Sequence, residues 1–330
     1  MRYELFNRNK LNIKPLLERE SKSDLSIIIN PDSPLPQVSE EEFSRLEKIA
    51  SLIKESREKN APVIFSFGAH LIKNGLSEIL IELMKRGYVQ HILGNGAVSI
   101  HDWELAYQGK TEEDVRKYLE EGQFGLWEET GKYINRAIKE HCLEGYGNAV
   151  GRLISEEKLK GEQIPHKHKE ISVLGNAFSL KIPASICPQI GCDIIYTHPE
   201  CDGAAIGEAA YIDFLKFANT ISNLENGTYV SIGSAITSPM VFEKALSMAK
   251  NLAKQENRKL ENYNIIVNDI QEGEWDWSKG LEPPKNNPAY YLRFMKTFSR
   301  ARGNSQYIKM DNRSFLHNLY HLLNNFNQNL

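Results

Sequence analysis

The sequence predicts an α/β protein built on an open, mostly parallel sheet with helices on both faces. Three observations carry this prediction: short apolar runs suited to buried strands, glycine turns directly after them, and helical patterns after the turns. Residues 62–67 followed by Gly68, and residues 89–93 followed by Gly94, give this unit twice in succession. Because parallel strands end at one edge of a sheet, we expect both turns at the same ligand-binding rim.

The composition limits the class of partner. The chain has 330 residues, enough for a sizeable core, and its 40 basic and 43 acidic residues nearly cancel. Neither nucleic acid nor a membrane surface is therefore expected as a partner. No apolar run approaches the roughly 20 residues of a membrane helix, and the first residues lack the apolar core of a secretion signal. We expect a cytoplasmic protein that acts on a small molecule.

The chain is predicted to have an N-terminal arm over residues 1–38 and a single α/β domain over residues 39–330. Three prolines near the end of the arm make it irregular. The charged segment 155–169 resembles a linker, but it separates units of the same kind and so does not divide the domain. His166 and His168 within it are expected to be solvated.

Helices are predicted where apolar residues recur with a helical period between suitable ends. The first has Leu46 and Ile49 on one stripe and Ser39 as its cap, and Thr111 followed by three acidic residues, 112–114, indicates another helix start. The predicted helices cover residues 40–59, 76–86, 111–121, 126–143, 171–180, 206–221, 238–253, 290–298 and 313–325. The predicted strands cover residues 62–67, 89–93, 184–187, 192–196, 228–232, 265–267 and 305–310.

A glycine-rich loop at residues 145–151 resembles a phosphate-binding motif only in part. Its glycines occupy the first, third and seventh positions. A dinucleotide fingerprint needs them at the first, third and sixth positions, directly after a strand, whereas the segment before this loop reads as helical. Close packing between helices is therefore the preferred interpretation.

Candidate site residues gather between Asp193 and Tyr211, in the stretch DIIYTHPECDGAAIGEAAY. His198, Asp202 and Glu208 lie there among small residues that let a ligand approach the backbone. An ordinary strand-to-helix turn, with Asp202 as the helix cap and Glu208 on its first turns, explains the same letters. Both interpretations stay open at this point.

Three histidines are predicted to share the rim of the sheet. His70, His101 and His198 each lie in a different glycine-rich turn, and a histidine can take up or release a proton near neutral pH. Asp102 or Asp202 could orient such a base. The same histidines with nearby carboxylates could instead bind a divalent metal that activates water. The four cysteines fit no common zinc spacing, and buried free thiols are expected.

The turns at residues 66–75, 93–102, 202–208 and 232–234 together resemble those of the deoxyhypusine synthase family, over roughly residues 60–270. The resemblance implies a Rossmann-like fold in a divergent bacterial branch and an NAD-dependent dehydrogenase or aminoalkyl transferase acting on a polyamine or another small polar substrate. It also implies a homo-oligomer, by resemblance a tetramer, with sites between subunits. The implied NAD-binding residues are Gly68, Ala69, His70, Asn95, Gly96, Ala97, Asp202, Gly233 and Ser234.

The same resemblance, with the histidines above, gives the candidate catalytic residues His101, His198, Asp202, Glu208 and Lys279. The chain departs from the synthases at Ala69-His70, where they carry Ser-Asn, and it lacks the histidine that follows their strand-end glycines. Trp277-Ser278-Lys279 is similar to their lysine motif but follows Asn268 too closely. Three functions therefore remain open: NAD-dependent dehydrogenation or transfer, metal-dependent hydrolysis, and nucleotide binding without catalysis.

Overall fold

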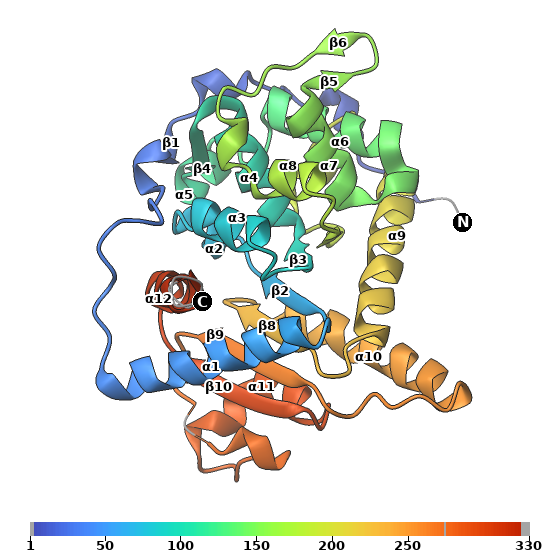
Figure 1. Cartoon of the computed structure of the whole chain (residues 1–330). Coiled ribbons are helices and arrows are strands. Elements are labelled where there is room, and N and C mark those ends of the chain that lie inside the picture. Colours follow the sequence, from blue (N-terminus) through green and yellow to red (C-terminus); the bar gives the residue numbers. More distant parts are fainter. Residues whose placement is uncertain (1–2, 274, 325–330) are drawn as a thin grey trace.

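A computed structural model describes residues 3–273 and 275–324 and is built around a six-stranded parallel sheet (Figure 1). From edge to edge the strand order is β10, β9, β8, β2, β3 and β7. The strands are β2 (Val63–Phe67), β3 (His91–Asn95), β7 (Ala184–Cys187), β8 (Thr228–Ile232), β9 (Asn264–Asp269) and β10 (Asn304–Lys309). The predicted α/β class and parallel sheet are confirmed, and all but one of the predicted strands are present.

The strand order divides the sheet into two halves that meet at β2. The chain adds β3 and then β7 on one side of β2, and then returns to add β8, β9 and β10 on the other side. In such doubly wound sheets, ligands bind outside the carboxyl ends of the two strands at which the order reverses. Here those strands are β2 and β8.

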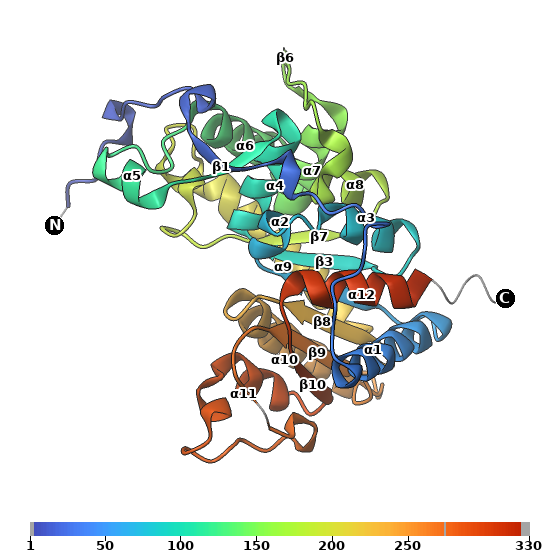
Figure 2. The same cartoon turned by 90° about the vertical axis from the view of Figure 1, so that its left-hand side faces the viewer.

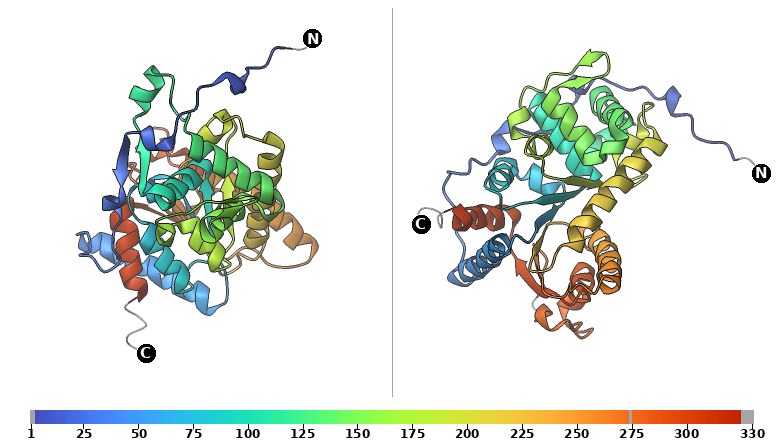
Figure 3. Two further views of the ribbon diagram at one scale, coloured as in Figure 1. Left: turned by 90° about the horizontal axis from the view of Figure 1, so that it is seen from above. Right: turned by 45° about the vertical axis from the view of Figure 1, so that its right-hand side comes forward.

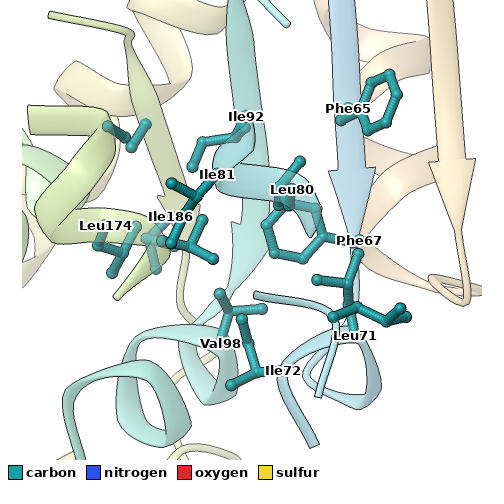
Figure 4. Close-up of a cluster of buried hydrophobic side chains, with 14 of the residues drawn as sticks. Phe65, Phe67, Leu71, Ile72, Leu80, Ile81, Ile92, Val98, Leu174 and Ile186 are labelled. Atoms are coloured by element: carbon teal, nitrogen blue, oxygen red, sulfur yellow. The ribbon is translucent and has the colours of Figure 1, made fainter. Parts of the chain in front are cut away.

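Alternate residues of the strands enter two separate cores, one on each face of the sheet. Phe65 packs with helices α1 (Glu40–Glu58), α3 (Ser77–Lys85) and α12 (Asn312–Asn324). Ile64 packs with helices α9 (Gly203–Ser222), α10 (Thr237–Gln255) and α11 (Arg293–Ser299). Figure 2 shows α1 and α12 side by side next to the sheet, and Figure 4 shows part of the first core, in which Phe67, Leu80 and Ile92 converge. Because both faces of the sheet are covered, the strands have mostly apolar sequences without an alternation of polar and apolar residues.

A helical layer lies between β3 and β7 in the chain. It consists of α4 (Gly96–Gln108), β4 (Lys110–Glu113), α5 (Val115–Glu120), α6 (Glu128–His141), α7 (Tyr146–Glu156), β5 (Lys158–Leu159), β6 (Glu162–Gln163) and α8 (Val173–Ser179). The four-residue helix α2 (His70–Lys73) follows β2 directly. Short 3-10 turns lie at Arg8–Lys10, Leu16–Glu18, Leu25–Ile27, Cys142–Glu144, Lys169–Ile171, Ile194–Thr197, Trp277–Lys279 and Pro288–Tyr291. None of the described helices is long and apolar enough to cross a membrane.

The N-terminal arm is more ordered than its prolines predicted. Strand β1 (Ser21–Asp24) pairs antiparallel with β4, and Figure 3 shows the arm running along the outside of the helical layer. The helix predicted to start at 111–114 is therefore wrong, because these residues form β4 against the arm. Only Asp114 behaves as expected of a helix start, since its side chain accepts a hydrogen bond from Lys117 N and caps α5.

Three further predictions need correction. Residues 192–196 do not form a strand, because Ile194–Thr197 is a 3-10 turn. The segment 155–169 is not an exposed linker, since it forms the β5–β6 hairpin and buries His166, whose Nδ1 lies 2.8 Å from the carbonyl oxygen of Ile164. His101 is not in a turn either, because Asn95 caps α4 and the helix begins at Gly96.

Two predictions about local sequence are confirmed in detail. Ser39 and Glu42 form a reciprocal capping box at the start of α1. The glycines of the 145–151 loop serve close packing, because a Cβ on Gly147 would overlap the carbonyl oxygen of Ala184 and one on Gly151 would lie 2.5 Å from that of Leu174.

Candidate functional site

The site has two neighbouring parts, and the first is the crevice where the turns after β2 and β8 meet, which we call the switch crevice. A Cβ on Gly68 would lie only 2.6 Å from the carbonyl oxygen of Gly233. The amide of Gly68 donates to the carbonyl of Ile232 at 3.4 Å, and the amide of Gly233 donates to that of Asn268 at 3.0 Å. Gly233 has a φ of +54°, which a side chain would strain. The glycines therefore bring three strand ends together.

Polar groups around Gly233 are held in place by the last two strands and α12. The side-chain amide of Asn268 donates to the carbonyl of Met310 at 2.8 Å. Its buried Oδ1 has no hydrogen-bond partner in the described part of the chain. Asn312, at the start of α12, packs its side chain against Gly233. A buried acceptor without a donor is costly, so Oδ1 is a candidate contact for a ligand hydroxyl or amide.

The end of β3 adjoins this crevice and leads into α4. Asn95 accepts a hydrogen bond from Val98 N at 3.2 Å, which leaves the amides of Gly96 and Ala97 at the helix start. The Asp193 carboxylate occupies the space into which a Cβ on Gly96 would project. Burial raises the pKa of Asp193, although Gln189 N donates to it at 2.7 Å.

The second part is a cavity of about 220 Å³ between the N-terminal arm, α2, α4 and β4, which we call the arm pocket. Thirteen residues line it: Arg19, Lys73, Ala97, Ile100, His101, Glu104, Glu112, Glu113, Val115, Phe124, Cys192, Asp193 and Ile194. The two parts are close because Lys73 lies on the same short helix as His70, and Ala97 follows the end of β3. Of this lining, sequence reasoning placed Ala97, His101 and, as a possible metal ligand at the start of the 193–211 stretch, Asp193 in a site.

Glu104 is the most completely bound group of the arm pocket. Arg19 donates to both of its oxygens at 2.8 Å, Thr111 donates to Oε2 at 2.7 Å, and Thr130 donates to Oε1 at 2.8 Å. Burial acts to raise the pKa of Glu104, but the charge and hydrogen bonds of Arg19 hold it below its ordinary value. Each oxygen accepts two hydrogen bonds, so Glu104 is ionised and has no capacity left for a substrate.

The remaining charged groups of the arm pocket are less saturated. Lys73 and Glu112 form an ion pair at 2.8 Å, and Glu112 has a φ of +68°, an uncommon conformation for a residue with a side chain. Glu113 accepts from Trp127 Nε1 at 2.8 Å, and burial raises its pKa. With Asp193 and Glu104, the lining has four carboxylates against the two cations Arg19 and Lys73. This balance suits a ligand that carries positive charge.

His101 contributes an imidazole to the same pocket. Its Nδ1 lies 2.8 Å from Thr111 Oγ1, and its Nε2 has no hydrogen-bond partner within the described residues. Burial lowers the pKa of His101 to about 4, so the ring is neutral at physiological pH. Asp102 does not orient it, because the Asp102 carboxylate accepts from Ser172 Oγ and from the amides of Val173 and Leu174 at the start of α8.

The candidates of the 193–211 stretch lie apart from both parts. Asp202 caps α9 by accepting from Ala204 N and Ala205 N, and it lies 3.7 Å from Lys139 of α6. Figure 1 shows that this end of α9 reaches α6. Glu208 is exposed on α9, next to the thiol of Cys142. The ordinary interpretation of these two residues, a helix cap and an exposed acid in the second turn of the same helix, accounts for their contacts.

His198 and Lys279 are also outside the two parts. His198 is buried under α6, where its Nε2 lies 3.4 Å from Glu128 and its Nδ1 accepts from Glu200 N. The side chain of Lys279 is 68% exposed and pairs with Asp276 at 2.9 Å in the 3-10 turn Trp277–Lys279. The expectation that His70, His101 and His198 meet at one rim is therefore wrong: His70 is exposed on α2, whereas His101 contacts β4 and His198 contacts α6.

The described residues contain no group of three His, Cys, Asp or Glu side chains arranged to hold a metal ion. The metal-binding alternative relied on the three histidines acting together with carboxylates. Because the histidines are separated, that alternative loses its structural basis.

Comparisons with known proteins agree with the fold. A family model described as the C-terminal Rossmann-fold domain of ArgZ-like arginine dihydrolases matches residues 47–141. Among solved structures, the ternary complex of AgrE with ornithine and NAD+ is 16% identical, with a TM-score of 0.52 over 90% of this chain and 35% of that chain. A conserved protein of Methanococcus maripaludis S2, provisionally described as LOR/SDH, is 16% identical, with a TM-score of 0.53 over 90% of this chain and 71% of that chain.

The chain thus spans about a third of the length of AgrE. A provisionally described deoxyhypusine synthase of Entamoeba histolytica is 9% identical with a TM-score of 0.44, which is too low to support an argument about function. No curated protein sequence matches the chain. At these identities the neighbours establish a Rossmann-like fold and nothing more specific.

Proposed function

We propose that the chain binds NAD in the switch crevice and uses it to dehydrogenate a small amine-bearing substrate in the arm pocket. The observation that carries this proposal is the contact between Gly68 and Gly233 at the carboxyl ends of β2 and β8. Doubly wound sheets bind dinucleotides at this reversal of strand order, and glycines there let the backbone approach the ligand. AgrE, which shares the fold, was crystallised with NAD+ and ornithine.

The residues that would hold NAD are those of three adjoining turns. Gly68, Ala69 and His70 follow β2, and Gly233 and Ser234 follow β8. Asn95 ends β3, and Gly96 and Ala97 follow it; β3 is the second strand of the series, whose end in dinucleotide-binding folds meets a ribose. The unpaired Oδ1 of Asn268 offers a further acceptor. Asp202 is left out of this set, because its contacts are with α9 and α6.

The arm pocket supplies the groups that an amine substrate needs. Glu112, Glu113 and Asp193 offer carboxylates to an ammonium group, and Lys73 offers a cation to an acidic group on the same substrate. Only a free amine has the lone pair that expels hydride, so the ammonium must first lose a proton, and the neutral Nε2 of His101 can accept it. Bound NAD would accept the hydride, and the substrate would leave as an iminium ion.

The finer expectations from the resemblance differ in their support. Aminoalkyl transfer would need a lysine that forms an imine. Lys279, the lysine that the resemblance implies, does not line the arm pocket, and Lys73, which does, is paired with Glu112. Dehydrogenation needs no lysine nucleophile and is therefore the better-supported half of the expected chemistry. A homotetramer stays a prediction, and light scattering on the purified chain would test it.

The test is a calorimetric titration with NAD of the wild-type chain and two matched variants. Ala235→Trp adds bulk at an exposed alanine in the turn after β8, and Ala204→Trp adds the same bulk at an exposed alanine on α9. We expect Ala235→Trp to weaken binding by tenfold or more, about 1.4 kcal/mol, and Ala204→Trp and Asp202→Ala to leave it unchanged. Absence of NAD binding to the wild-type chain, or equal binding by Ala235→Trp, would overturn the proposal.

A further inference from the structure

The hydrogen bonds around Thr111 determine which nitrogen of His101 carries the proton. Thr111 Oγ1 lies 2.7 Å from Glu104 Oε2 and 2.8 Å from His101 Nδ1. A hydroxyl has one hydrogen to donate, and an ionised carboxylate can only accept. Thr111 must therefore donate to Glu104 and accept from His101. It follows that Nδ1 of His101 carries the hydrogen and that Nε2 has the lone pair.

The ionisation of Glu104, on which this reasoning depends, comes from the N-terminal arm. Arg19 contacts both Glu104 oxygens, and the side chains of both residues are 1% exposed. Burial acts to lower the pKa of Arg19, but the charge of Glu104 raises it, so the pair is ionised. Arg19 itself is held by β1, whose pairing with β4 places Ser21 opposite Glu113 and Ser23 opposite Thr111. The arm thus sets the charge that orients the Thr111 hydroxyl.

We infer that Arg19, Glu104 and Thr111 are positioning residues that hold His101 in a single tautomer, with Nε2 presented to the arm pocket as a proton acceptor. This inference rests on the proposed function for the identity of the proton donor, an ammonium group of the substrate. In that step one N–H bond of the substrate breaks, one Nε2–H bond forms, and the imidazolium keeps its Nδ1–H bond to Thr111. Arg19, Glu104 and Thr111 keep their hydrogen bonds and their charges in this step, and only the His101 ring gains a positive charge.

The arrangement also provides an internal control. Thr130 donates to Glu104 Oε1 at 2.8 Å, just as Thr111 donates to Oε2, and both threonines are buried. Only Thr111 is within hydrogen-bond distance of His101. Removing either hydroxyl takes one hydrogen bond from Glu104, so a difference between the two variants reports on His101 alone.

The experiment is nitrogen-15 NMR of the histidine-labelled 330-residue chain at neutral pH, with His101→Asn used to assign the His101 signals. We expect wild-type His101 to show a protonated Nδ1 and an unprotonated Nε2. Thr130→Val and Thr111→Ser should keep this pattern, whereas Thr111→Val should give the other tautomer or a mixture. A protonated Nε2 in the wild-type ring would overturn the inference, and so would an unchanged pattern in Thr111→Val.

The measurement on the wild-type chain decides the tautomer even if Thr111→Val does not fold. It needs neither NAD nor substrate, so its outcome is separate from that of the calorimetric titration. If the chain binds NAD but His101 has the other tautomer, the proposed cofactor is supported and the inference about His101 is overturned. If His101 has the expected tautomer but the chain does not bind NAD, the inference about the tautomer stands and the proposed function is overturned.

Discussion

The carbonyl oxygen of Gly233 lies 2.6 Å from the position that a Cβ on Gly68 would take. Gly68→Ala must therefore move one of two strand-end turns, and we expect it to lower the free energy of unfolding by about 1–3 kcal/mol. Gly207→Ala is the control, because nothing lies within 4 Å of its Cβ position inside α9, and alanine there should stabilise by roughly 0.5–1 kcal/mol. Chemical denaturation of both variants measures this, and equal stability of Gly68→Ala and wild type would contradict the close contact.

Removal of Arg19 should be more damaging than removal of an exposed partner on the same arm. Arg19→Met leaves the buried Glu104 carboxylate without its cation, which typically costs about 3–5 kcal/mol. Lys22→Met removes a half-exposed pair with Asp114, and we expect a loss of about 1 kcal/mol or less. Adding Glu104→Met to Arg19→Met should recover part of the loss, as measured by urea denaturation at neutral pH. A double variant less stable than Arg19→Met would refute this account of the pair.

Asp213 should make stability fall as the pH rises. Burial raises its pKa to about 7, although the amides of Gly147 and Ile186 donate to Oδ2, and Oδ1 has no partner among the described residues. A carboxyl group with a raised folded-state pKa stabilises the fold fully below its unfolded pKa of 3.8, and this contribution is lost as the pH rises toward 7.

Asp213→Asn cannot titrate, so the difference between its stability and that of the wild type isolates this group. Between about pH 4 and 7 the wild type should lose stability relative to the variant, by at most about 1.4 kcal/mol per pH unit. Urea denaturation at several pH values in this window measures the difference. Parallel curves for the two proteins would show that Asp213 titrates as it does in the unfolded chain.

Lys279→Ala should have almost no effect. Lys279 is exposed and forms an exposed ion pair with Asp276, so we expect a change in stability below about 0.5 kcal/mol and unchanged binding of NAD. Lys73→Ala is the informative comparison, because Lys73 lines the arm pocket and pairs with Glu112. Once a substrate is identified, loss of turnover in Lys279→Ala but not in Lys73→Ala would reverse the assignment of the two lysines.

The sheet could be predicted because its signals are local. Residues 63–67 and 228–232 are mostly apolar and buried throughout, and each is followed by a glycine that the strand end requires. The same local interpretation failed at residues 111–114, because Thr111 and the three acidic residues after it resemble a helix start. There the deciding contact is the pairing with residues 21–24. Pairing between segments that are distant in the chain produces no periodic pattern in the sequence of either segment.

The cofactor half of the site was more predictable than the substrate half. Gly68 and Gly233 could be placed at the rim because each directly follows an apolar run, although only the strand order in the structure shows that their two turns meet. The arm pocket draws Arg19, Lys73 and Glu104 from three segments that only the tertiary fold brings together. One signal was present: Glu104 lies between Trp103 and Leu105, and a charged residue between apolar neighbours that become buried needs a buried partner.

The central position of β2 has a consequence for the order of folding. Val63 pairs with Thr228, about 165 residues later, whereas β3 pairs with β2 after a short connection. Contacts between distant residues form slowly, because the intervening chain must first lose its freedom. During synthesis, β2, β3 and β7 can assemble with the helical layer and the arm before β8 leaves the ribosome. The arm pocket would then be complete in a nascent chain that still lacks the crevice between β2 and β8.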